Sequence, residues 1–287
     1  MSRALPVLTV LVAIIFVWYV AAIGMNAQWA QDQAARAGVE LTRAELIKDT
    51  LSQDRPVLPT PHQVAAGLWD GVFGQAITSK RSLVYHAWVT LSATMAGFAI
   101  GSLAGILLAV GIVHDRTMDQ SVMPWAVASQ TVPILAIAPM VIVVLASIGV
   151  TGLLPKAVIS AWLSFFPVLV GMVTGLRTPD AMQMDLMRSW NASRAQSFRR
   201  LRLPSSMPYL FASLKVAVAA ALVGTIVGEL PAGATSGLGA RLLSGSYYGQ
   251  TVQIWAALFM AAALAALLVM GIGLIERVTL RRMGLVR

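Results

Sequence analysis

Long stretches without a charged residue constrain this chain more than any other feature of its sequence. A bilayer core about 30 Å thick is crossed by roughly 20 predominantly apolar helical residues. Six stretches reach that length, so the sequence predicts an all-α, polytopic membrane protein with six transmembrane helices. One of them, residues 203–228, contains a single charge, Lys215. The other five contain no Asp, Glu, Lys or Arg and are residues 5–25, 87–113, 120–155, 157–176 and 242–275.

The rest of the composition excludes several kinds of protein. Charged residues make up 11% of the chain, against about 25% in an ordinary soluble domain. The absence of cysteine excludes disulfides, thiolate metal sites and cysteine nucleophiles. The three histidines do not have the spacing of a metal site, and His114, beside Asp115 and Arg116, is expected in a solvated loop. We therefore expect no metal and no cofactor on this chain.

The distribution of arginine predicts the orientation of the helices. A net charge of +9 would indicate a nucleic-acid partner in a soluble chain, but here it comes from arginines that orient helices, and no nucleic acid is expected. If the first helix starts in the cytoplasm, the basic clusters at 177–202 and 277–287 lie inside, and the short outer loops hold only Lys156 and Arg241. The positive-inside rule then predicts a protein of the bacterial inner membrane with both termini in the cytoplasm.

The first apolar stretch has a second interpretation as a cleaved signal peptide, because residues 22–30 contain small side chains. Its apolar core is longer than the roughly 7–15 residues of a signal, which favours a retained helix at 1–25. We expect three further segments: a periplasmic segment at 26–83, a transmembrane core at 84–276 that includes a cytoplasmic loop at 177–208, and a basic tail at 277–287.

The periplasmic segment is expected to contain amphipathic helices. Its first helix is indicated by apolar residues at helical spacing, and a second by a capping-box start before Val64, Leu68, Trp69 and Phe73. No catalytic cluster occurs there, so we expect a spacer without a ligand role. The apolar positions of the first helix are Val39, Leu41, Leu46, Ile47 and Leu51, and the start of the second is Thr60, Pro61 and Gln63.

The loop at 177–208 contains the run DLMRSWNASRAQSFRRLRLP, residues 185–204, between long apolar stretches. Connections between helices of a bundle usually need about two to eight residues, so this loop is longer than a connection requires. Asn191 tolerates a left-handed backbone, which predicts two short helices hinged at Asn191, and Pro204 and Pro208 are expected to mark the start of the next helix. The mixture of Arg, Met, Trp and Phe favours contact with another protein, and the alternative is a membrane-surface helix whose arginines contact anionic lipid headgroups.

The spacing in this loop resembles the EAA loop of type I ABC importer permeases, which reads E-A-A, three residues, G, nine residues, then I-x-L-P. Here Asp185-Leu186-Met187 stand at E-A-A, Asn191 at the glycine, Leu201 at the isoleucine and Leu203-Pro204 at the end. The residues differ from the pattern, but Asp185 keeps the carboxylate and Asn191 keeps access to the left-handed backbone.

The resemblance extends over roughly residues 84–276. The runs TLSATMAGFAIGSLAGILLAVGI, QTVPILAIAPMVIVVLASIGVTGLLPK, FFPVLVGMVTGLRT, MPYLFASLKVAVAAALVGTIVGEL and GLGARLL look like consecutive segments of the nitrate, taurine, sulfonate and thiamine-precursor branch of these permeases. The resemblance implies the type I importer permease fold and a small nutrient as substrate, either an organic anion of the sulfonate or nitrate type or a pyrimidine-like thiamine precursor. Residues 26–60 do not fit the pattern.

The resemblance also implies what the loop does. It would be a coupling helix that docks on a dimer of cytoplasmic ABC ATPases, and it would carry no chemistry itself. The ATPase, with its ATP and Mg²⁺, must be a separate chain because no G-x-x-x-x-G-K-[ST] phosphate loop occurs here. The other implied partners are a second permease copy or a related permease, a periplasmic binding protein and membrane lipid. The implied coupling residues are Asp185, Arg188, Asn191, Ala192, Ser193, Phe198, Leu201 and Pro204.

Polar groups inside apolar helices are the candidates for a substrate path, because they usually face a cavity or a partner. Glu229 either lines the path or closes an outer gate, or else caps local backbone or pairs with Arg241. Trp162 and Phe165 could line the path or pack at a dimer seam, the interpretation that we favour. The remaining candidates are Ser129, Gln130 and Thr225.

Two other features bear on the fold and on the alternatives. Gly97, Gly101 and Gly105 recur every four residues, which predicts a close helix–helix contact rather than a site. The main alternative function is an autonomous secondary transporter or channel, which predicts inverted repeats and mid-membrane acids. We find no repeat, and Glu229 and Glu276 lie near helix ends. A membrane-embedded enzyme would need a convergent catalytic set, and none occurs in the sequence.

Overall fold

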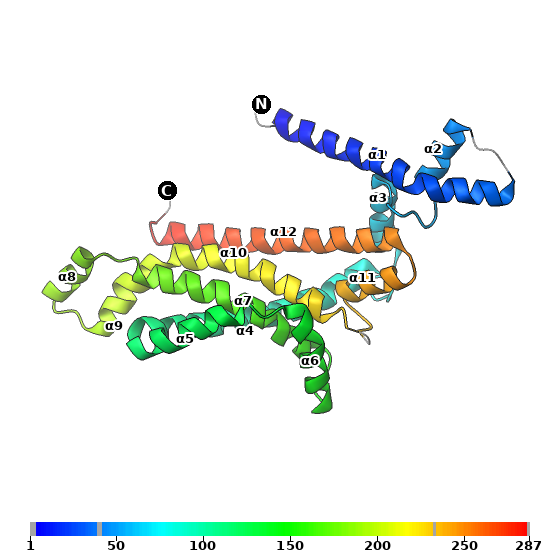
Figure 1. Cartoon of the computed structure of the whole chain (residues 1–287). Helices are drawn as coiled ribbons and strands as arrows, with labels where there is room; N and C mark the ends of the chain where they lie inside the picture. Colours follow the sequence, from blue (N-terminus) through cyan, green and yellow to red (C-terminus); the bar gives the residue numbers. More distant parts are fainter. Residues whose placement is uncertain (1–3, 39–41, 232–233, 286–287) are drawn as a thin grey trace. The chain divides into compact units, whose positions relative to one another are not determined.

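The structure is a computed structural model that describes residues 4–38, 42–231 and 234–285, and the regular elements in these ranges are helices (Figure 1). Val39, Leu41 and Arg287, which belong to the segments named in the sequence predictions, lie outside them. The elements are α1 (Ala4–Ala37), α2 (Arg43–Ser52), α3 (Pro61–Trp69), η1 (Asp70–Gly74), α4 (Leu83–His114), α5 (Arg116–Ser129), α6 (Ile134–Ser147), α7 (Leu153–Arg177), α8 (Ala181–Ser189), α9 (Arg194–Ser197), η2 (Phe198–Arg202), α10 (Leu203–Gly228), α11 (Leu238–Tyr247) and α12 (Thr251–Arg282).

The membrane-spanning segments agree with the expected six, with one difference. Among the described residues, five helical segments are long and apolar enough to cross a membrane, and a sixth is obtained if α5 and α6 count as one span. The expected single helix over 120–155 is wrong, because this stretch is divided between α5 and α6, which meet at an angle of 98°. Pro133 explains the break, since a proline disfavours the helical conformation of the residue before it.

Contacts divide the chain into two compact units, each described by itself. Unit 1 comprises Met1–His86 and Ala240–Ala261, and unit 2 comprises Ala87–Gly239 and Ala262–Arg287. The helices also differ from the expected segment ends: α1 continues past Met25 to Ala37, and α12 continues past Glu276 to Arg282. The expected segment boundaries therefore fall inside helices, and as boundaries of function they stay predictions.

Unit 2 is built on α4, α7 and α10, which approach one another closely because glycines face their neighbours. A Cβ on Gly101 of α4 would lie 2.2 Å from the Ser164 Oγ and 2.6 Å from the Ala161 carbonyl oxygen of α7. Gly97 and Gly105 face α7 in the same way. The predicted close helix–helix contact is confirmed, and its partner is α7.

The second close contact in unit 2 joins α7 to α10, which lie side by side (Figure 1). A Cβ on Gly224 would lie 2.9 Å from the Ser160 Cα, so a larger residue would force the helices apart. Val168, Ala217, Val218 and Ala221 fill the buried core between them. Close packing of small residues is the usual way in which membrane helices associate.

The only charge expected inside an apolar stretch, Lys215, has a partner. Lys215 of α10 forms an ion pair with Glu276 of α12, and their side chains are 35% and 19% exposed. Charged groups within membrane helices usually pair with one another. The pair therefore joins two spanning helices and explains why a lysine and a glutamate occur in them.

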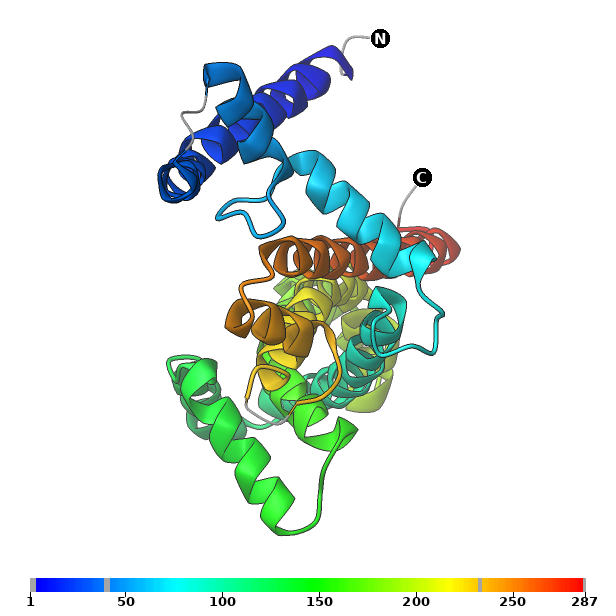
Figure 2. The same ribbon diagram turned by 90° about the vertical axis from the view of Figure 1, so that its right-hand side faces the viewer.

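Unit 1 is organised around Asn26 of α1, which is fully buried. Its Nδ2 donates to the carbonyl oxygens of Thr50 at 3.2 Å and Leu58 at 3.0 Å, and its Oδ1 accepts from the Leu58 N–H at 3.1 Å. The Trp18 Nε1 donates to the Pro59 carbonyl oxygen at 2.9 Å. These bonds hold the loop between α2 and α3 beside α1 (Figure 2), within the described part of the segment that did not fit the family pattern.

The predicted amphipathic helices correspond to α2 and to α3 with η1, because α3 ends at Trp69 and Phe73 lies in η1. The Thr60 N–H donates to the Gln63 Oε1 at 3.0 Å, and Pro61 occupies the first turn, so the predicted capping-box start is confirmed. Val64 is buried, whereas Trp69 and Phe73 are each 68% exposed. These two rings contact each other at 4.5 Å between centroids.

Candidate functional site

The loop between α7 and α10 contains the predicted hinge at Asn191. Asn191 has φ 53°, and among non-glycine residues with described backbone it alone has positive φ. The Asn191 N–H donates to the Arg188 carbonyl oxygen at 2.8 Å, and the Ala192 N–H donates to that of Met187 at 3.0 Å. This pair of bonds is a Schellman motif, which ends a helix with a left-handed residue. Asn is one of the few residue types that accept this conformation.

The next helix starts directly after the hinge. The Ser193 N–H donates to the Gln196 Oε1 at 2.8 Å, and the Gln196 N–H donates to the Ser193 Oγ at 3.3 Å. Ser193 and Gln196 thus form a capping box at the start of α9. One helix ends and another begins within three residues, Asn191, Ala192 and Ser193, so the predicted pair of helices hinged at Asn191 is confirmed.

The second helix of the pair differs from the prediction at its far end. It does not end before Pro208; α9 continues through the wide turn η2 into α10, and Pro208 lies inside α10. In η2 the Leu203 N–H donates to the Phe198 carbonyl oxygen, five residues back. A π-type turn gives room for a proline that an α-helix would exclude, and Pro204 directly follows this turn, at the start of α10.

The α8 helix presents an exposed surface of mixed character. Met182, Leu186 and Trp190 are 82%, 50% and 70% exposed. Asp185 and Arg188, also exposed, form an ion pair of 2.7 Å one turn apart. Large exposed apolar side chains beside charges are typical of a surface that contacts another protein.

The other expected coupling residues lie around the hinge. Asn191 and Ser193 are exposed, whereas Ala192, Phe198, Leu201 and Pro204 are partly buried. The Phe198 ring contacts the ring of His114, at the end of α4, with centroids 5.1 Å apart. His114 is exposed as predicted, but it also connects the coupling loop to α4. A cavity of about 510 Å³ beside this contact is lined by Arg188, Arg194 and Arg202 among others.

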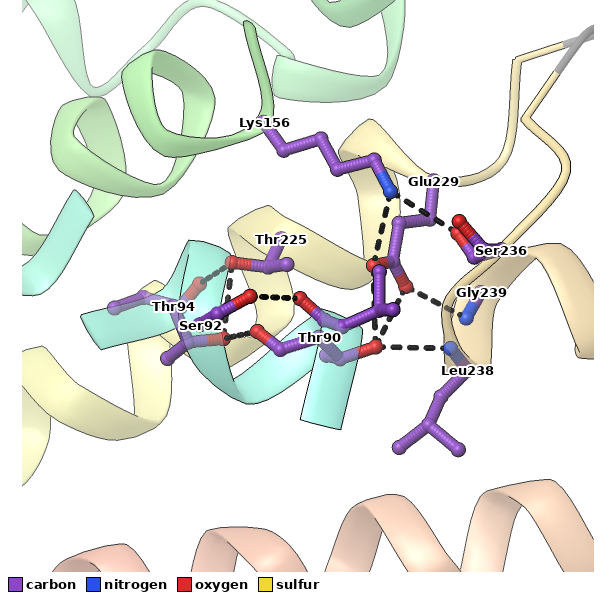
Figure 3. Close-up of polar contacts among 11 residues, drawn as sticks. Thr90, Ser92, Thr94, Lys156, Thr225, Glu229, Ser236, Leu238 and Gly239 are labelled. Atoms are coloured by element: carbon purple, nitrogen blue, oxygen red, sulfur yellow. Dashed lines mark hydrogen bonds and ion pairs between the residues drawn. The ribbon is translucent and has the colours of Figure 1, made fainter. Parts of the chain in front are cut away.

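A second polar site lies at the other end of α10, around Glu229 (Figure 3). Glu229 is fully buried. The Thr90 Oγ1 lies 2.9 Å from its Oε2, the Gly239 N–H donates to Oε2 at 3.0 Å, and the Lys156 Nζ lies 3.4 Å from Oε1. Burial raises the pKa of the Glu229 carboxyl, and the Lys156 ammonium and the hydrogen bonds from Gly239 and Thr90 act in the opposite direction.

The Glu229 site also fixes the loop that follows α10. The Leu238 N–H donates to the Thr90 Oγ1 at 2.9 Å, and the Lys156 Nζ donates to the Ser236 carbonyl oxygen at 3.0 Å. Gly237 has φ +117°, and a Cβ there would lie 2.1 Å from the Glu229 carboxylate carbon. The described part of residues 230–239 is thus tied to α4, α7 and α10 by Thr90, Lys156 and Glu229.

The contacts of Glu229 bear on the structural role that the sequence left open for it, in which it caps local backbone or pairs with Arg241. Glu229 caps local backbone, as expected for a structural role, but its ion-pair partner is Lys156 and not Arg241. Whether Glu229 also contacts substrate stays a prediction. Thr225 is buried nearby, where its Oγ1 lies 3.0 Å from that of Thr94.

The other expected path residues lie elsewhere in unit 2. Gln130 is exposed at the end of α5, and its Nε2 donates to the Ser129 Oγ at 3.2 Å. Trp162 is 39% exposed and makes an edge-to-face contact with Phe165, with 6.1 Å between ring centroids. The structure thus brings together Ser129 with Gln130 and Trp162 with Phe165, whereas Thr225 and Glu229 have other partners.

Sequence reasoning missed Thr90, Thr94 and Lys156 as members of the Glu229 site. Thr90 and Thr94 stand four residues apart in an apolar stretch, which places them on one face of α4. This spacing is a signal that could have indicated a polar contact. Lys156, between two uncharged stretches, was treated only as a charge in an outer loop.

Comparison with known proteins places most of this chain in one family. Residues 101–284 match the family model described as binding-protein-dependent transport system inner membrane component. The chain is 31% identical to the riboflavin transport system permease protein RibX of Chloroflexus aurantiacus, over 78% of this chain and 80% of that protein. It is 31% identical to the formylaminopyrimidine transport permease protein ThiX of Halalkalibacterium halodurans, over 64% and 68%. It is 25% identical to the putative aliphatic sulfonates transport permease protein SsuC of Bacillus subtilis, over 78% of each.

Proposed function

Because this chain belongs to the binding-protein-dependent transport system inner membrane components, the permease subunits of type I ABC importers, we propose that its α8–α9 hinge couples ATP hydrolysis to nutrient import. Its relatives are ABC transport permeases for small nutrients, so the chain is a multi-pass permease subunit that works with an ATPase and a binding protein. The residues that couple, the substrate, the subunit arrangement and the orientation are our proposals.

The observation that carries the coupling proposal is the left-handed backbone of Asn191, φ 53°, at the position of the family's glycine. It sets the direction of α8 relative to α9, and α9 continues through η2 into the spanning helix α10. A displacement of α8 would therefore be transmitted to the spanning helix α10 through a short, hydrogen-bonded connection. Transporters of this kind alternate between two states, and a ligand shifts them only by binding one state better.

The exposed residues of α8 would contact the ATPase directly. Leu186 and Trp190 supply apolar surface, and Asp185 and Arg188 supply charges that can exchange their mutual ion pair for partners on the ATPase. ATP and Mg²⁺ would be bound by the ATPase dimer alone. This chain would bind no cofactor and catalyse no reaction itself, and a second permease, identical or related, would complete the path.

The orientation that we propose places the coupling loop in the cytoplasm and the Glu229 site at the outer end of unit 2. Arg194, Arg199 and Arg200 are exposed on the loop, and Lys/Arg excess marks the cytoplasmic side. Both termini would then be cytoplasmic, in the bacterial inner membrane. The substrate path would run from the outer end past Gln130, Trp162 and the buried polar contacts of α4, α7 and α10.

We further propose that the substrate is a small heteroaromatic nutrient rather than a sulfonate or nitrate. The two relatives at 31% identity are named for riboflavin and formylaminopyrimidine, whereas the sulfonate relative is 25% identical. Trp162, exposed beside Phe165, supplies an aromatic surface on which a planar ring could stack.

The test of this function is purification of the tagged full chain from its native membrane, with mass spectrometry of the proteins that accompany it. We expect an ATPase with a phosphate-loop motif to copurify with the wild type and to be lost from Asp185→Lys. Reconstituted with that ATPase and binding protein, the chain should take up substrate only with ATP. Recovery of the chain alone, still moving solute into liposomes without ATP, would assign it to the secondary transporters instead.

A further inference from the structure

Unit 1 contains a polar cavity that the coupling function does not use. Its volume is about 710 Å³, and its lining includes Arg55, Arg81 and Arg241. The lining comes from the loop after α2, from α3, η1 and the segment before α4, and from α11 and α12. Small-molecule sites usually have volumes of about 300–1,000 Å³. The cavity is therefore large enough for a ligand.

Arg241 is the feature of this cavity that needs an explanation. Its Nε atom is buried and has no hydrogen-bond partner within the part of the chain that the structure describes. Its guanidinium forms no ion pair with any described carboxylate, and burial lowers the pKa of Arg241. Buried donors are rarely left without an acceptor, because the lost hydrogen bond destabilises the fold. The Arg241 guanidinium, which lines the cavity, therefore has donor capacity that no described group takes up.

The acidic residues of the cavity do not supply that acceptor. Asp54 and Asp70 also line it, but neither lies within ion-pair distance of Arg55, Arg81 or Arg241. The Asp70 Oδ2 instead accepts from the Gln75 Nε2 at 3.4 Å. Three guanidinium groups and two carboxylates thus share one cavity without neutralising one another, and the cationic groups are in excess.

We propose that this cavity binds an oxyanion, a phosphate-type group carried by a free small molecule or by a lipid headgroup, with Arg241 as its direct ligand. A guanidinium presents several N–H donors in one plane and matches the oxygens of phosphate with paired hydrogen bonds. Arg55 and Arg81 are exposed, so they guide and complete the binding at the open side. Arg55 and Arg81 lie before residue 101, where the family match begins.

The test uses the full chain in nanodiscs of neutral phosphatidylcholine, with radiolabelled inorganic phosphate as the probe. We expect saturable binding to the wild type that weakens about tenfold or more in Arg241→Gln, since a hydrogen bond to a charged group contributes on that order. Arg36→Gln is the matched control, because Arg36 is an exposed arginine of unit 1 that does not line the cavity. Its phosphate affinity should equal that of the wild type.

A second arm distinguishes the source of the oxyanion. The same variants are purified from membranes that contain phosphatidylglycerol, and retained lipid is measured by native mass spectrometry. Retention by the wild type and by Arg36→Gln, but not by Arg241→Gln, assigns the cavity to a lipid headgroup; phosphate binding without retained lipid assigns it to a free anion. If Arg241→Gln does not fold, Arg55→Gln and Arg81→Gln test the proposal instead. Each is expected to bind phosphate at least about twofold more weakly than the wild type. The proposal is overturned if neither phosphate binding nor lipid retention changes on substitution of any of these arginines.

Discussion

The Thr90 hydroxyl of α4 donates to the Glu229 carboxylate at the end of α10, 2.9 Å away and 139 positions along the chain. The same hydroxyl oxygen accepts from the Leu238 N–H at 2.9 Å. One side chain therefore satisfies a buried carboxylate and a buried backbone donor together. Thr90 therefore connects the loop after α10 to α4 within unit 2.

Replacing Thr90 by valine is expected to destabilise the protein. Thr90→Val keeps nearly the same shape but removes both hydrogen bonds, leaving the Leu238 N–H without a partner and the Glu229 carboxylate with one donor fewer. The expected loss is about 2–4 kcal/mol of unfolding free energy, measured by thermal denaturation in detergent. Thr90→Ser, which retains the hydroxyl, is the control and should lie within about 1 kcal/mol of the wild type. Equal melting of the valine and serine variants would contradict the assignment.

The ion pair between Lys156 and Glu229 predicts strong coupling between two substitutions. Lys156→Gln leaves the fully buried Glu229 without its cation, and Glu229→Gln replaces an acceptor by an amide whose N–H group faces other donors. The double variant removes both charges, so it should be less destabilised than the sum of the single variants by about 1–3 kcal/mol. A double-mutant cycle of unfolding free energies measures this coupling. Additive effects would show that the pair contributes little.

Alanine substitutions at Gly237 and Gly149 distinguish the stability cost of backbone strain from that of a steric clash. Both have positive φ, +117° and +82°, but a Cβ at Gly237 would lie 2.1 Å from the Glu229 carboxylate carbon, whereas nothing lies within 4 Å at Gly149. Gly149→Ala should cost about 1 kcal/mol, the backbone penalty alone. Gly237→Ala should cost about 3 kcal/mol or more, because the Glu229 carboxylate must move as well. Thermal denaturation of the two variants checks this, and equal losses would exclude the clash as the cause.

The coupling loop could be predicted from the sequence because its signals are local. Asn191 is a residue type that ends helices in the left-handed conformation, and Ser193 with Gln196 begins the next helix. The three glycines of α4 likewise predicted a close contact. Continuation of α9 into α10 past Pro204 could not be predicted, because the wide turn at Phe198–Arg202 that admits the proline has no sequence signal.

The Glu229 site could be predicted only in part. Glu229 stands out as an acid at the end of an apolar stretch, but its partners Thr90 and Lys156 are 139 and 73 positions away in the sequence. Only the packing of α4 and α7 against α10 brings them together. The bend between α5 and α6 was missed because the absence of charge over 120–155 outweighed the breaking effect of Pro133.

Substitutions at Asn191 test whether the left-handed hinge couples ATP hydrolysis to transport. Glycine adopts φ near 53° without strain, whereas a β-branched residue does so at a cost of about 1–2 kcal/mol. Asn191→Gly should therefore transport like the wild type, and Asn191→Val should move the direction of α8 relative to α9 and lose most uptake. Asp185→Lys should lose uptake for a different reason: it reverses a charge on the exposed face of α8 without changing the hinge, and should thereby lose the bound ATPase.

The measurement is ATP hydrolysis and substrate uptake by the reconstituted complex, followed in the same proteoliposomes. Uncoupling appears as uptake reduced about tenfold or more relative to hydrolysis, at an unchanged melting temperature of the membrane part; a tenfold ratio corresponds to about 1.4 kcal/mol of lost coupling. Asn191 is exposed and lies outside the buried cores of unit 2, so the substitutions are expected to leave those cores intact. Wild-type uptake per ATP in both Asn191→Val and Asp185→Lys would remove the hinge and the α8 surface from the mechanism. Loss of uptake in Asn191→Gly as well would show that the Asn191 side chain, and not its backbone conformation, makes the contact.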